Sequence, residues 1–542
     1  MEYRALVAVV LSILILVGFQ FFFRKELPKT PPPTTQPETT IQRPEPATQK
    51  KEHAPVIPNV LPAKKAESLP TPSPDFKPRD ITVETDLFKT VFTEHGGAVK
   101  HFFLKKYRSE LAVDSPPVDL INVTSYPYPL QTGVSEGKEP IMTPVFCSAD
   151  KEGLVLNEGQ KEGKLNFSCR LENGTTLVKT FTFKNGSYLM GLGLASENHA
   201  PFEGVISLYN RPRGKGSSYV FEGPEYFQKG VLEEVDLKDQ NLAIKGPVTW
   251  TGFGDNYFLC ALIPSSQDKS TGTSFEKGKR GTVVTSSLNY QAQDGQGQFL
   301  VYLGPKDMNE LKKAGYNLSH SINFGYFDII AKPLLYVLKF SHKFIHNYGV
   351  AIILLTILIK IIFWPLSHKS AQSMKTMQKI QPKLQKLKEK YGDDKTKFNQ
   401  EMLQLYKTYK VNPASGCLPM IIQIPVFFAL YKVLLQCIEL RHAPFALWIN
   451  DLSAPDRLMI PGIAIPYLGG LPILTILMGV SMYFQQKMTP TSMDPTQAKV
   501  MQFLPVLFIF LFISFPSGLV LYWLVNNVLT ISQQYYTNKF TK

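Results

Sequence analysis

The run GVAIILLTILIKIIFWPL, residues 349–366, decides the fold class of this 542-residue chain. Its 18 residues would form about 27 Å of helix, close to the ~30 Å hydrocarbon core of a bilayer. The run therefore predicts a membrane-spanning helix. Its one charged residue is Lys360, and an ammonium at the centre of such a helix costs at least about 2.5–3.5 kcal/mol. Two interpretations stay open: the lysine snorkels to the lipid–water boundary, or it lines a functional cavity.

Other apolar runs predict a six-helix α transmembrane bundle, made of an N-terminal anchor and a five-helix core. The anchor comprises residues 1–24; a signal peptide is the alternative, but no small-x-small cleavage site precedes Arg24. The core, residues 349–536, is predicted to contain the spans 349–366, 417–438, 465–485, 500–515 and 517–534. The span 500–515 gives only about 24 Å of helix, so we expect a thinner bilayer beside it.

Loop charges predict the orientation of these spans. Residues 367–416 carry eleven lysines against four acidic residues, whereas residues 439–464 carry two arginines against three acidic residues. Loops rich in Lys and Arg remain in the cytoplasm, so residues 367–416 are predicted to be cytoplasmic. An even number of spans then places both termini in the cytoplasm and the long segment after the anchor on the outer side.

That outer segment divides into a linker and a β domain. Residues 25–79 are rich in proline and poor in aromatic residues, which predicts a disordered linker. Residues 80–320 show a period of two and predict a large antiparallel β-sandwich. Asn173-Gly174 and Asn185-Gly186 are expected to form type I′ hairpin turns. The residues expected to share a buried face are Leu165, Phe167, Cys169 and Leu171 on one strand and Leu177, Lys179, Phe181 and Phe183 on the next.

Cysteine usage and motifs limit the chemistry. Cys147, Cys169 and Cys260 lie in the predicted β domain, so one disulfide with one remaining thiol, or no disulfide at all, are both open. The sequence has no CxxC, P-loop or HExxH motif. Its GxSxG match, GVSEG at residues 133–137, lies in the predicted β domain and not at the strand-to-helix turn that a nucleophilic serine of this motif needs. We therefore expect no cofactor, no metal, no catalytic residues and no nucleotide hydrolysis.

Two amphipathic segments flank the first core span. In residues 321–348 the polar positions, from Lys332 through Lys339 to His346, lie opposite Leu338, which favours an interfacial helix over an ordinary core helix. In residues 367–416 apolar residues recur every three to four positions on both sides of Gly392, which predicts a cytoplasmic helical hairpin. The hairpin is either a spacer or a contact surface for a client, anionic lipid or the ribosome, and its candidate contacts are Met374, Met377, Lys383 and Lys386.

Polar residues on several predicted spans complement Lys360. Thr356 lies one turn before it on the same face, and Gln423 lies early in the span 417–438. The last predicted span, 517–534, carries a further stripe of polar residues along one face: Tyr522, Asn526, Thr530 and Gln533. Each polar residue alone could serve only to hold helices together. As a set they predict an amphiphilic groove that is wet on its cytoplasmic side.

Four sequence runs resemble the YidC/Oxa/Alb family of membrane protein insertases. They are FGYFDIIAKPLL (324–335), NPASGCLPMIIQIPVFFALY (412–431), LRHAPFALWINDLS (440–453) and FPSGLVLYWLVNN (515–527). The anchor, linker and β domain resemble the long Gram-negative form of this family. The resemblance implies a bacterial inner-membrane protein with a periplasmic β-supersandwich similar to sugar-binding folds. It also implies a monomer that receives hydrophobic segments of nascent membrane proteins and releases them into lipid, alone or with the Sec translocon, and with the ribosome as a further partner.

The resemblance also assigns the groove. When the motifs are aligned, the arginine of the family's groove corresponds to Lys360, with Thr356 and Gln423 beside it. The lysine that replaces arginine keeps the positive charge but lacks the planar guanidinium with its five hydrogen-bond donors. Lys432 stands where the family usually has an uncharged residue, and we expect it to snorkel outward. Trp523 replaces a common tyrosine. The complete predicted groove consists of Lys360, Thr356, Gln423, Tyr522, Trp523 and Asn526.

Two other protein classes compete with an insertase. A polytopic channel or transporter should show inverted repeats or paired charges at mid-membrane, and the sequence shows one deep charge and no repeat. A membrane-anchored carbohydrate-active enzyme needs a carboxylate or histidine pair in the β domain, and no spacing in the sequence indicates one.

Overall fold

The computed structural model describes residues 78–112, 114–135, 146–170, 176–197, 199–212, 221–237, 241–265, 270–278, 283–392, 394–409, 418–462, 468–488 and 495–540. The predicted anchor and nearly all of the predicted linker lie outside these residues. So do Leu171, the Asn173-Gly174 turn and Cys417, which were also part of the sequence predictions.

Nineteen strands among the described residues form three sheets, which confirms the predicted β domain. The first sheet contains, in spatial order, β4 (Pro117–Asp119), β3 (Ala98–Arg108), β2 (Phe88–Thr93), β1 (Asp80–Glu84) and β7 (Gly153–Val155). The second contains β13 (Val231–Glu234), β12 (Gly223–Gln228), β15 (Trp250–Gly254), β16 (Phe258–Pro264), β19 (Gln296–Pro305), β10 (Leu189–Ser196), β9 (Thr176–Lys184), β8 (Glu162–Arg170) and β6 (Cys147–Ala149). The third contains β14 (Leu242–Lys245), β17 (Ser270–Lys277), β18 (Val284–Ala292), β11 (Phe202–Asn210) and β5 (Gln131–Ser135). Neighbouring strands pair antiparallel except β1 and β7.

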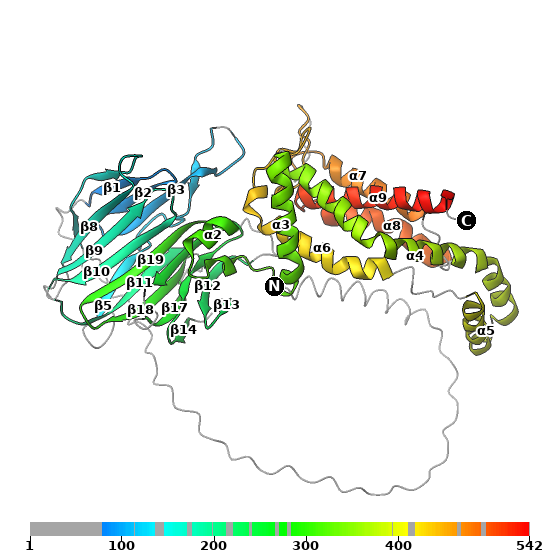
Figure 1. Ribbon diagram of the computed structural model, residues 1–542, viewed down its shortest axis with the longest axis horizontal. Coiled ribbons are helices and arrows are strands. Elements are labelled where there is room, and N and C mark those ends of the chain that lie inside the picture. The colour runs from blue at the N-terminus through cyan, green and yellow to red at the C-terminus, as the bar shows by residue number, and fades with distance from the viewer. Residues whose placement is uncertain are drawn as a thin grey trace, which may run out of the picture. The chain divides into compact units, whose positions relative to one another are not determined.

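Both five-stranded sheets pack on the nine-stranded sheet, so the domain is a β-sandwich (Figure 1). Phe92 of β2 lies against Phe167 of β8 and Phe181 of β9, with ring centroids 5.9 and 4.7 Å apart. At the third sheet, Thr251 of β15 and Thr273 of β17 share a hydrogen bond of 2.8 Å between their hydroxyls. The buried aromatic rings lie on the alternating positions that the sequence predicted, because side chains two residues apart share a face of a strand.

The hairpin between β9 and β10 differs from its prediction. Its loop has four residues, from Asn185 to Tyr188, and Gly186 has φ +73° while Asn185 keeps negative φ. A type I′ turn needs positive φ at both central residues, so the predicted turn type is wrong here. Asn185 instead uses its side chain, whose Oδ1 accepts a hydrogen bond of 3.3 Å from the backbone N–H of Asp86.

The structure resolves the open question about the cysteines. Cys147 and Cys169 face each other in the β6–β8 register and form a disulfide, with Cα atoms 4.0 Å apart. Cys260 is the remaining thiol of the β domain and is buried. Disulfides persist in oxidising compartments, which agrees with the predicted position of this domain on the outer side of the membrane.

Replacing Cys147 and Cys169 together by serine should lower the free energy of unfolding of the β domain by about 3 kcal/mol. The bond closes a segment of 22 residues, and the loss of this loop constraint favours the unfolded chain. Urea unfolding of the purified protein, followed by near-ultraviolet circular dichroism, measures the change. A Cys260→Ser variant is the matched control for the loss of a buried sulfur, and equal midpoints for all three proteins would refute the prediction.

The helices follow the β domain. Their bounds are α2 (Met308–Ala314), η2 (Leu318–Ser321), η3 (Gly325–Phe327), α3 (Asp328–Ile345), α4 (Tyr348–Tyr391), α5 (Lys395–Thr408), α6 (Leu418–Gln436), η5 (Ile438–Leu440), α7 (Ile473–Met488), α8 (Pro495–Phe512) and α9 (Ser517–Phe540). The predicted span 349–366 and the first arm of the predicted hairpin are one continuous helix, α4, which leads to α5 (Figure 1).

Two helix starts differ from the prediction. The interfacial helix begins at Asp328 and not at residue 321, because Gly325 has φ +62° and interrupts the helical backbone. The span expected from residue 465 begins at Ile473. Gly469 has φ +73° and Pro472 immediately precedes the helix, while the Asp456 carboxylate accepts a hydrogen bond of 2.6 Å from the Leu474 N–H and fixes the first turn.

The last two predicted spans also have shifted ends. The helix predicted over 500–515 runs from Pro495 to Phe512 and stops before Pro516, and α9 continues past the predicted end at 534 to Phe540. By length and composition, one helix in the described part of the chain, α4, is long and apolar enough to cross a membrane. Ile421–Gln436 and Gln502–Phe512 are shorter apolar stretches of helix.

Candidate functional site

The predicted groove residue Lys360 bonds to Thr530, a member of the polar stripe that was predicted on the last span. The Lys360 Nζ donates a hydrogen bond of 2.7 Å to Thr530 Oγ1, and this hydroxyl donates one of 2.6 Å to the backbone carbonyl of Asn526. Lys360 lies on α4 and the other two on α9, which packs along α4 (Figure 1). The ammonium is half-buried and has a polar partner inside the helix bundle, so it does not depend on reaching the lipid–water boundary.

Thr356 lies one turn from Lys360 but is packed more tightly. Its side chain is 2% exposed, and its hydroxyl donates a hydrogen bond of 2.7 Å to the carbonyl of Ile352 in its own helix. Ser and Thr in apolar helices commonly satisfy their hydroxyl in this way. The Thr356 side chain is therefore buried in the structure, with its hydrogen-bond donor occupied within α4.

Gln423 and Tyr522 join a third helix to this arrangement. The Gln423 Nε2 on α6 lies 3.5 Å from the Tyr522 hydroxyl on α9, at the long limit of a hydrogen bond. Tyr522 is buried and Gln423 is half-buried. Lys360, Asn526, Thr530, Gln423 and Tyr522 therefore form a column of polar groups, called here the polar column, on three neighbouring helices.

Trp523 lies beside the polar column in an aromatic cluster. Its ring centroid is 4.8 Å from that of Phe427 on α6, 5.6 Å from Phe508 on α8 and 5.0 Å from Phe512 on α8. Aromatic rings thus fill the space where α6, α8 and α9 come together. Lys432, expected to snorkel outward, is half-buried on α6.

A second polar contact inside the bundle was not predicted. Asn527 on α9 donates a hydrogen bond of 2.9 Å to the hydroxyl of Ser481 on α7, and both side chains are buried. Asn527 follows Asn526 directly in the sequence and points to another helix, because neighbouring residues lie 100° apart around a helix. An apolar groove of about 450 Å³ lies alongside, between α7 and α9, and the predicted groove residues do not line it.

The helical hairpin presents only part of its predicted contact surface. Met377 is 5% exposed and packs with Ile380, Leu384 and Tyr406 in the small core between α4 and α5, so in this structure its side chain stabilises the hairpin and does not lie on its surface. Met374 is half-buried, and Lys386 is exposed. The Lys383 ammonium lies 4.6 Å from the ring centroid of Tyr409, and this cation–π contact also stabilises the hairpin.

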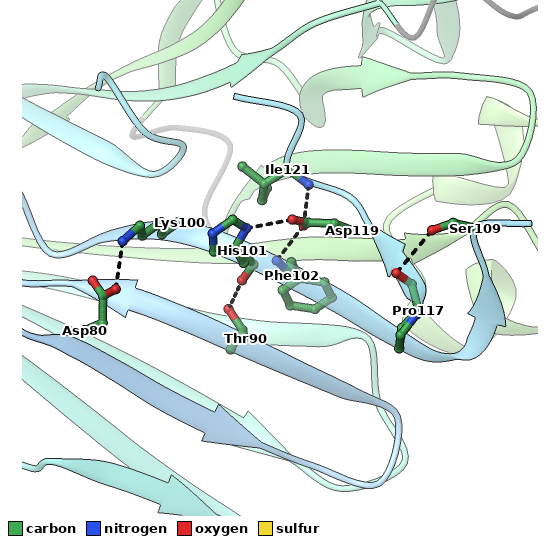
Figure 2. Close-up of polar contacts among 9 residues, drawn as sticks. All are labelled: Asp80, Thr90, Lys100, His101, Phe102, Ser109, Pro117, Asp119 and Ile121. Atoms are coloured by element: carbon green, nitrogen blue, oxygen red, sulfur yellow. Dashed lines mark hydrogen bonds and ion pairs between the residues drawn. The ribbon is translucent and has the colours of Figure 1, made fainter. Parts of the chain in front are cut away.

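The β domain contains a histidine–carboxylate pair that the sequence spacing did not reveal. Figure 2 shows His101 Nδ1 at 2.7 Å from Asp119 Oδ2, while Asp119 Oδ1 accepts hydrogen bonds from the N–H groups of Phe102 and Ile121. The aspartate thus joins β3 to the segment after β4. His101 and Asp119 line neither the pocket beside Glu225 and Lys306 nor the apolar groove between α7 and α9. Among the described residues, no group of three or more His, Cys, Asp or Glu side chains could hold a metal ion. The His101–Asp119 contact is explained by its role in holding β3 to the segment after β4, and it does not establish an enzyme site.

Two family profiles match consecutive parts of the chain. The profile described as "YidC periplasmic domain" matches residues 80–337, and the profile described as "60Kd inner membrane protein" matches residues 340–542. The chain belongs to the YidC family of membrane protein insertases. It is therefore related to bacterial inner-membrane insertases with a periplasmic domain, which here is the β domain.

Individual relatives agree with this assignment. The chain is 43% identical to the membrane protein insertase YidC of Syntrophus aciditrophicus, an alignment that covers 99% of this chain and all of the relative. It is 41% identical to that of Syntrophobacter fumaroxidans, with 99% of this chain and all of the relative covered. A solved active YidC insertase with its first transmembrane domain resolved is 22% identical, covers 84% of this chain and 91% of its own, and gives a TM-score of 0.38. The relatives from Syntrophus aciditrophicus and Syntrophobacter fumaroxidans are named for membrane insertion and not for an enzymatic reaction, in agreement with the prediction.

Proposed function

We propose that this member of the YidC family inserts nascent membrane proteins by receiving their hydrophobic segments beside the polar column and releasing them into the bilayer. The observation that carries the proposal is the Lys360–Thr530 hydrogen bond of 2.7 Å, because it keeps a cation and a hydroxyl together between apolar helices. The complete client-binding set is Lys360, Thr356, Gln423, Tyr522, Trp523 and Asn526. A polar lining of this kind lets water and a client's polar flank enter the bundle from the cytoplasm.

The transfer of a client segment from water into lipid is favourable overall, so the protein needs only to lower the barrier to that transfer. A client segment that leaves water for lipid gains about 0.8 kcal/mol per buried methylene. This gain exceeds the cost of moving a short polar flank across, provided that the flank meets hydrogen-bonding groups on the way. The polar column supplies such groups on α4, α6 and α9, and the exposed apolar face of α8, with Phe503 and Phe510, adjoins the lipid into which the client leaves.

The proposed topology has six spans with both termini in the cytoplasm. The helices α4, α6, α7, α8 and α9 form the five-helix core, and residues 1–24 are the sixth span. The β domain is periplasmic, so the helical hairpin of α4 and α5 lies on the opposite side of the membrane. Its many lysines support this orientation, because positive loops remain in the cytoplasm.

The helix α3 is proposed to lie in the periplasmic membrane interface. Ala331, Leu335 and Leu338 are buried against the bundle. The opposite side of α3 exposes large apolar residues: Ile329, Tyr336, Phe340 and Phe344. A helix with apolar groups on its outer side and aromatic rings among them is stabilised at the boundary between headgroups and acyl chains.

The partners follow from the same arrangement. Nascent membrane proteins are the clients, with the Sec translocon as an alternative route of delivery and the ribosome as a contact of the hairpin. Exposed Lys386 and half-buried Met374 remain the hairpin residues for such contacts, because Met377 and Lys383 serve the hairpin itself. The protein is proposed to act as a monomer.

Site-specific photocross-linking tests the site. A photoreactive amino acid at Gln423 or Trp523 should cross-link to the hydrophobic segment of a stalled nascent client, because Gln423 belongs to the polar column and Trp523 lies beside it. The matched control is Ile476 on α7, which is exposed but lies on a helix outside the polar column. Cross-linking that is as strong at residue 476 as at residues 423 and 523 would contradict the proposed site.

A further inference from the structure

Lys339 on α3 bonds with two carboxylates from distant parts of the chain. Its Nζ lies 3.1 Å from Asp307 Oδ2 and 2.5 Å from Glu439 Oε1. Asp307 follows the last strand of the β domain, β19, and Glu439 lies in η5, directly after α6. One ammonium therefore connects the β domain, α3 and one end of α6. The three residues are called here the ionic latch.

Each carboxylate of the ionic latch is also held on its own element. Asp307 caps α2, because its Oδ1 accepts hydrogen bonds of 2.7 Å from the Asn309 N–H and 3.1 Å from the Glu310 N–H. The Glu439 Oε2 accepts a hydrogen bond of 3.0 Å from the Cys437 thiol. Both carboxylates are thus oriented by their own neighbours, so the ammonium meets two fixed acceptors and loses less side-chain entropy on binding.

The ionic latch is shielded from solvent. The side chain of Lys339 is 23% exposed and those of Asp307 and Glu439 are each 16% exposed. The neighbouring pair on the same helix, Lys332 and Asp328, has side chains that are 45% and 36% exposed. Burial alone would raise the pKa of Asp307, but the Lys339 ammonium and the hydrogen bond from the Glu310 N–H help to hold that pKa below its ordinary value. Removing the lysine would leave two half-desolvated carboxylates close together, which is costly.

Other contacts fix the same end of α6. The Gln436 Nε2 donates a hydrogen bond of 3.2 Å to the Asn323 carbonyl, and the Arg441 Nη2 donates one of 3.1 Å to the Ser109 carbonyl in the β domain. Gln423 lies thirteen residues before Gln436, or about 20 Å along the helix, where its contact with Tyr522 is the long one of 3.5 Å. The two ends of α6 are therefore held with unequal strength.

We propose that Lys339 is a positioning residue for insertion: it fixes the periplasmic end of α6, so that α6 opens the polar column by moving its cytoplasmic end. This proposal rests on the proposed function, in which a client enters between α6 and the other helices of the polar column. A helix that is fixed at one end can separate from α9 near Gln423 while its other end keeps the β domain and α3 in place.

Hydrogen exchange and client insertion, measured on the same full-length protein in lipid nanodiscs, test the ionic latch. In Lys339→Met the amides of residues 437–441 and 309–311 should exchange about tenfold faster, while those of β8–β10 remain unchanged. Insertion of a client should slow by about fivefold, because the open position of α6 is no longer defined. Lys339→Arg should restore both properties, and Lys332→Met, which removes the exposed pair on the same helix, should change neither.

The outcomes separate this proposal from the proposed function. Unchanged exchange at residues 437–441 in Lys339→Met would refute the ionic latch. Faster exchange with an unchanged insertion rate would refute its positioning role. A wild-type protein that shows no client cross-link at Gln423 would refute the proposed site, while the exchange result would still stand for the ionic latch. If Lys339→Met does not accumulate, Glu439→Gln removes the charge with nearly the same shape and carries the same expectations.

Discussion

Lys360→Leu should slow the insertion of clients with acidic flanks by about tenfold or more, whereas Lys360→Arg should stay within about threefold of the wild type. Leucine removes the cation and leaves the Thr530 hydroxyl without its charged donor, and a charged hydrogen bond contributes about 1.5–3 kcal/mol. A loss of about 1.4 kcal/mol in the transition state is a tenfold change in rate. Arginine keeps the charge and adds donors, so a polar flank still meets a cation inside the bundle.

The measurement is the initial rate of insertion into proteoliposomes for one client with an acidic flank and one with a neutral flank. Thr530→Val removes the partner of the ammonium but keeps the charge, so we expect a smaller decrease of about threefold. Lys432→Leu is the matched control, because it removes another half-buried lysine from the same bundle. Equal rates for the wild type, Lys360→Leu and Lys360→Arg would mean that this lysine only stabilises the bundle.

The sequence predicted the elements better than their ends. The period of two in β8 and β9 follows from the alternation of side chains along a strand. It correctly predicted the buried positions of the described residues: Leu165, Phe167 and Cys169 on β8, and Leu177, Lys179, Phe181 and Phe183 on β9. Ile473 as the first residue of α7 was missed, because hydropathy alone does not register that Gly469 adopts positive φ. Asp456, which caps this helix, lies 18 residues before Leu474 and becomes its neighbour only in the folded chain.

The candidate site was predictable on each helix but not between helices. The spacing of Thr356 and Lys360 places them on one face of α4, and the spacing of Tyr522, Asn526 and Thr530 does the same on α9. That Lys360 bonds with Thr530, 170 residues away, depends on how the two helices pack. The partners of Lys339 were equally hidden from the sequence. Helical periodicity placed Lys339 on a polar outer face of its helix, whereas its partners Asp307 and Glu439 lie just after β19 and in η5.

Lys179 is the residue of the β domain whose burial has the largest expected consequence. Its side chain is fully buried in β9, and its Nζ donates hydrogen bonds of 3.0 Å to the Gly96 carbonyl and 2.8 Å to the Leu130 carbonyl. Desolvation by burial lowers the pKa of Lys179 to about 7. The unfolded chain keeps the ordinary value of about 10.4 and therefore binds more protons than the folded protein between pH 7 and pH 10.

The free energy of unfolding of the β domain should therefore contain a contribution from Lys179 that increases as the pH rises through this window. The maximum slope of this contribution is about 1.4 kcal/mol per pH unit. The free energy of unfolding of the wild type minus that of Lys179→Met should therefore increase by roughly 3–4 kcal/mol from pH 7 to pH 10. At pH 7 the variant loses two hydrogen bonds but no longer buries an amine, so the two proteins should be close in stability. Urea unfolding of both proteins at several pH values measures this difference in free energy. Other ionisable groups are the same in both proteins, so their contributions cancel in the difference. Lys184→Met, at the exposed end of the same strand, should run parallel to the wild type. A parallel profile for Lys179→Met as well would show that the buried ammonium keeps its proton, held by the two carbonyls that it joins.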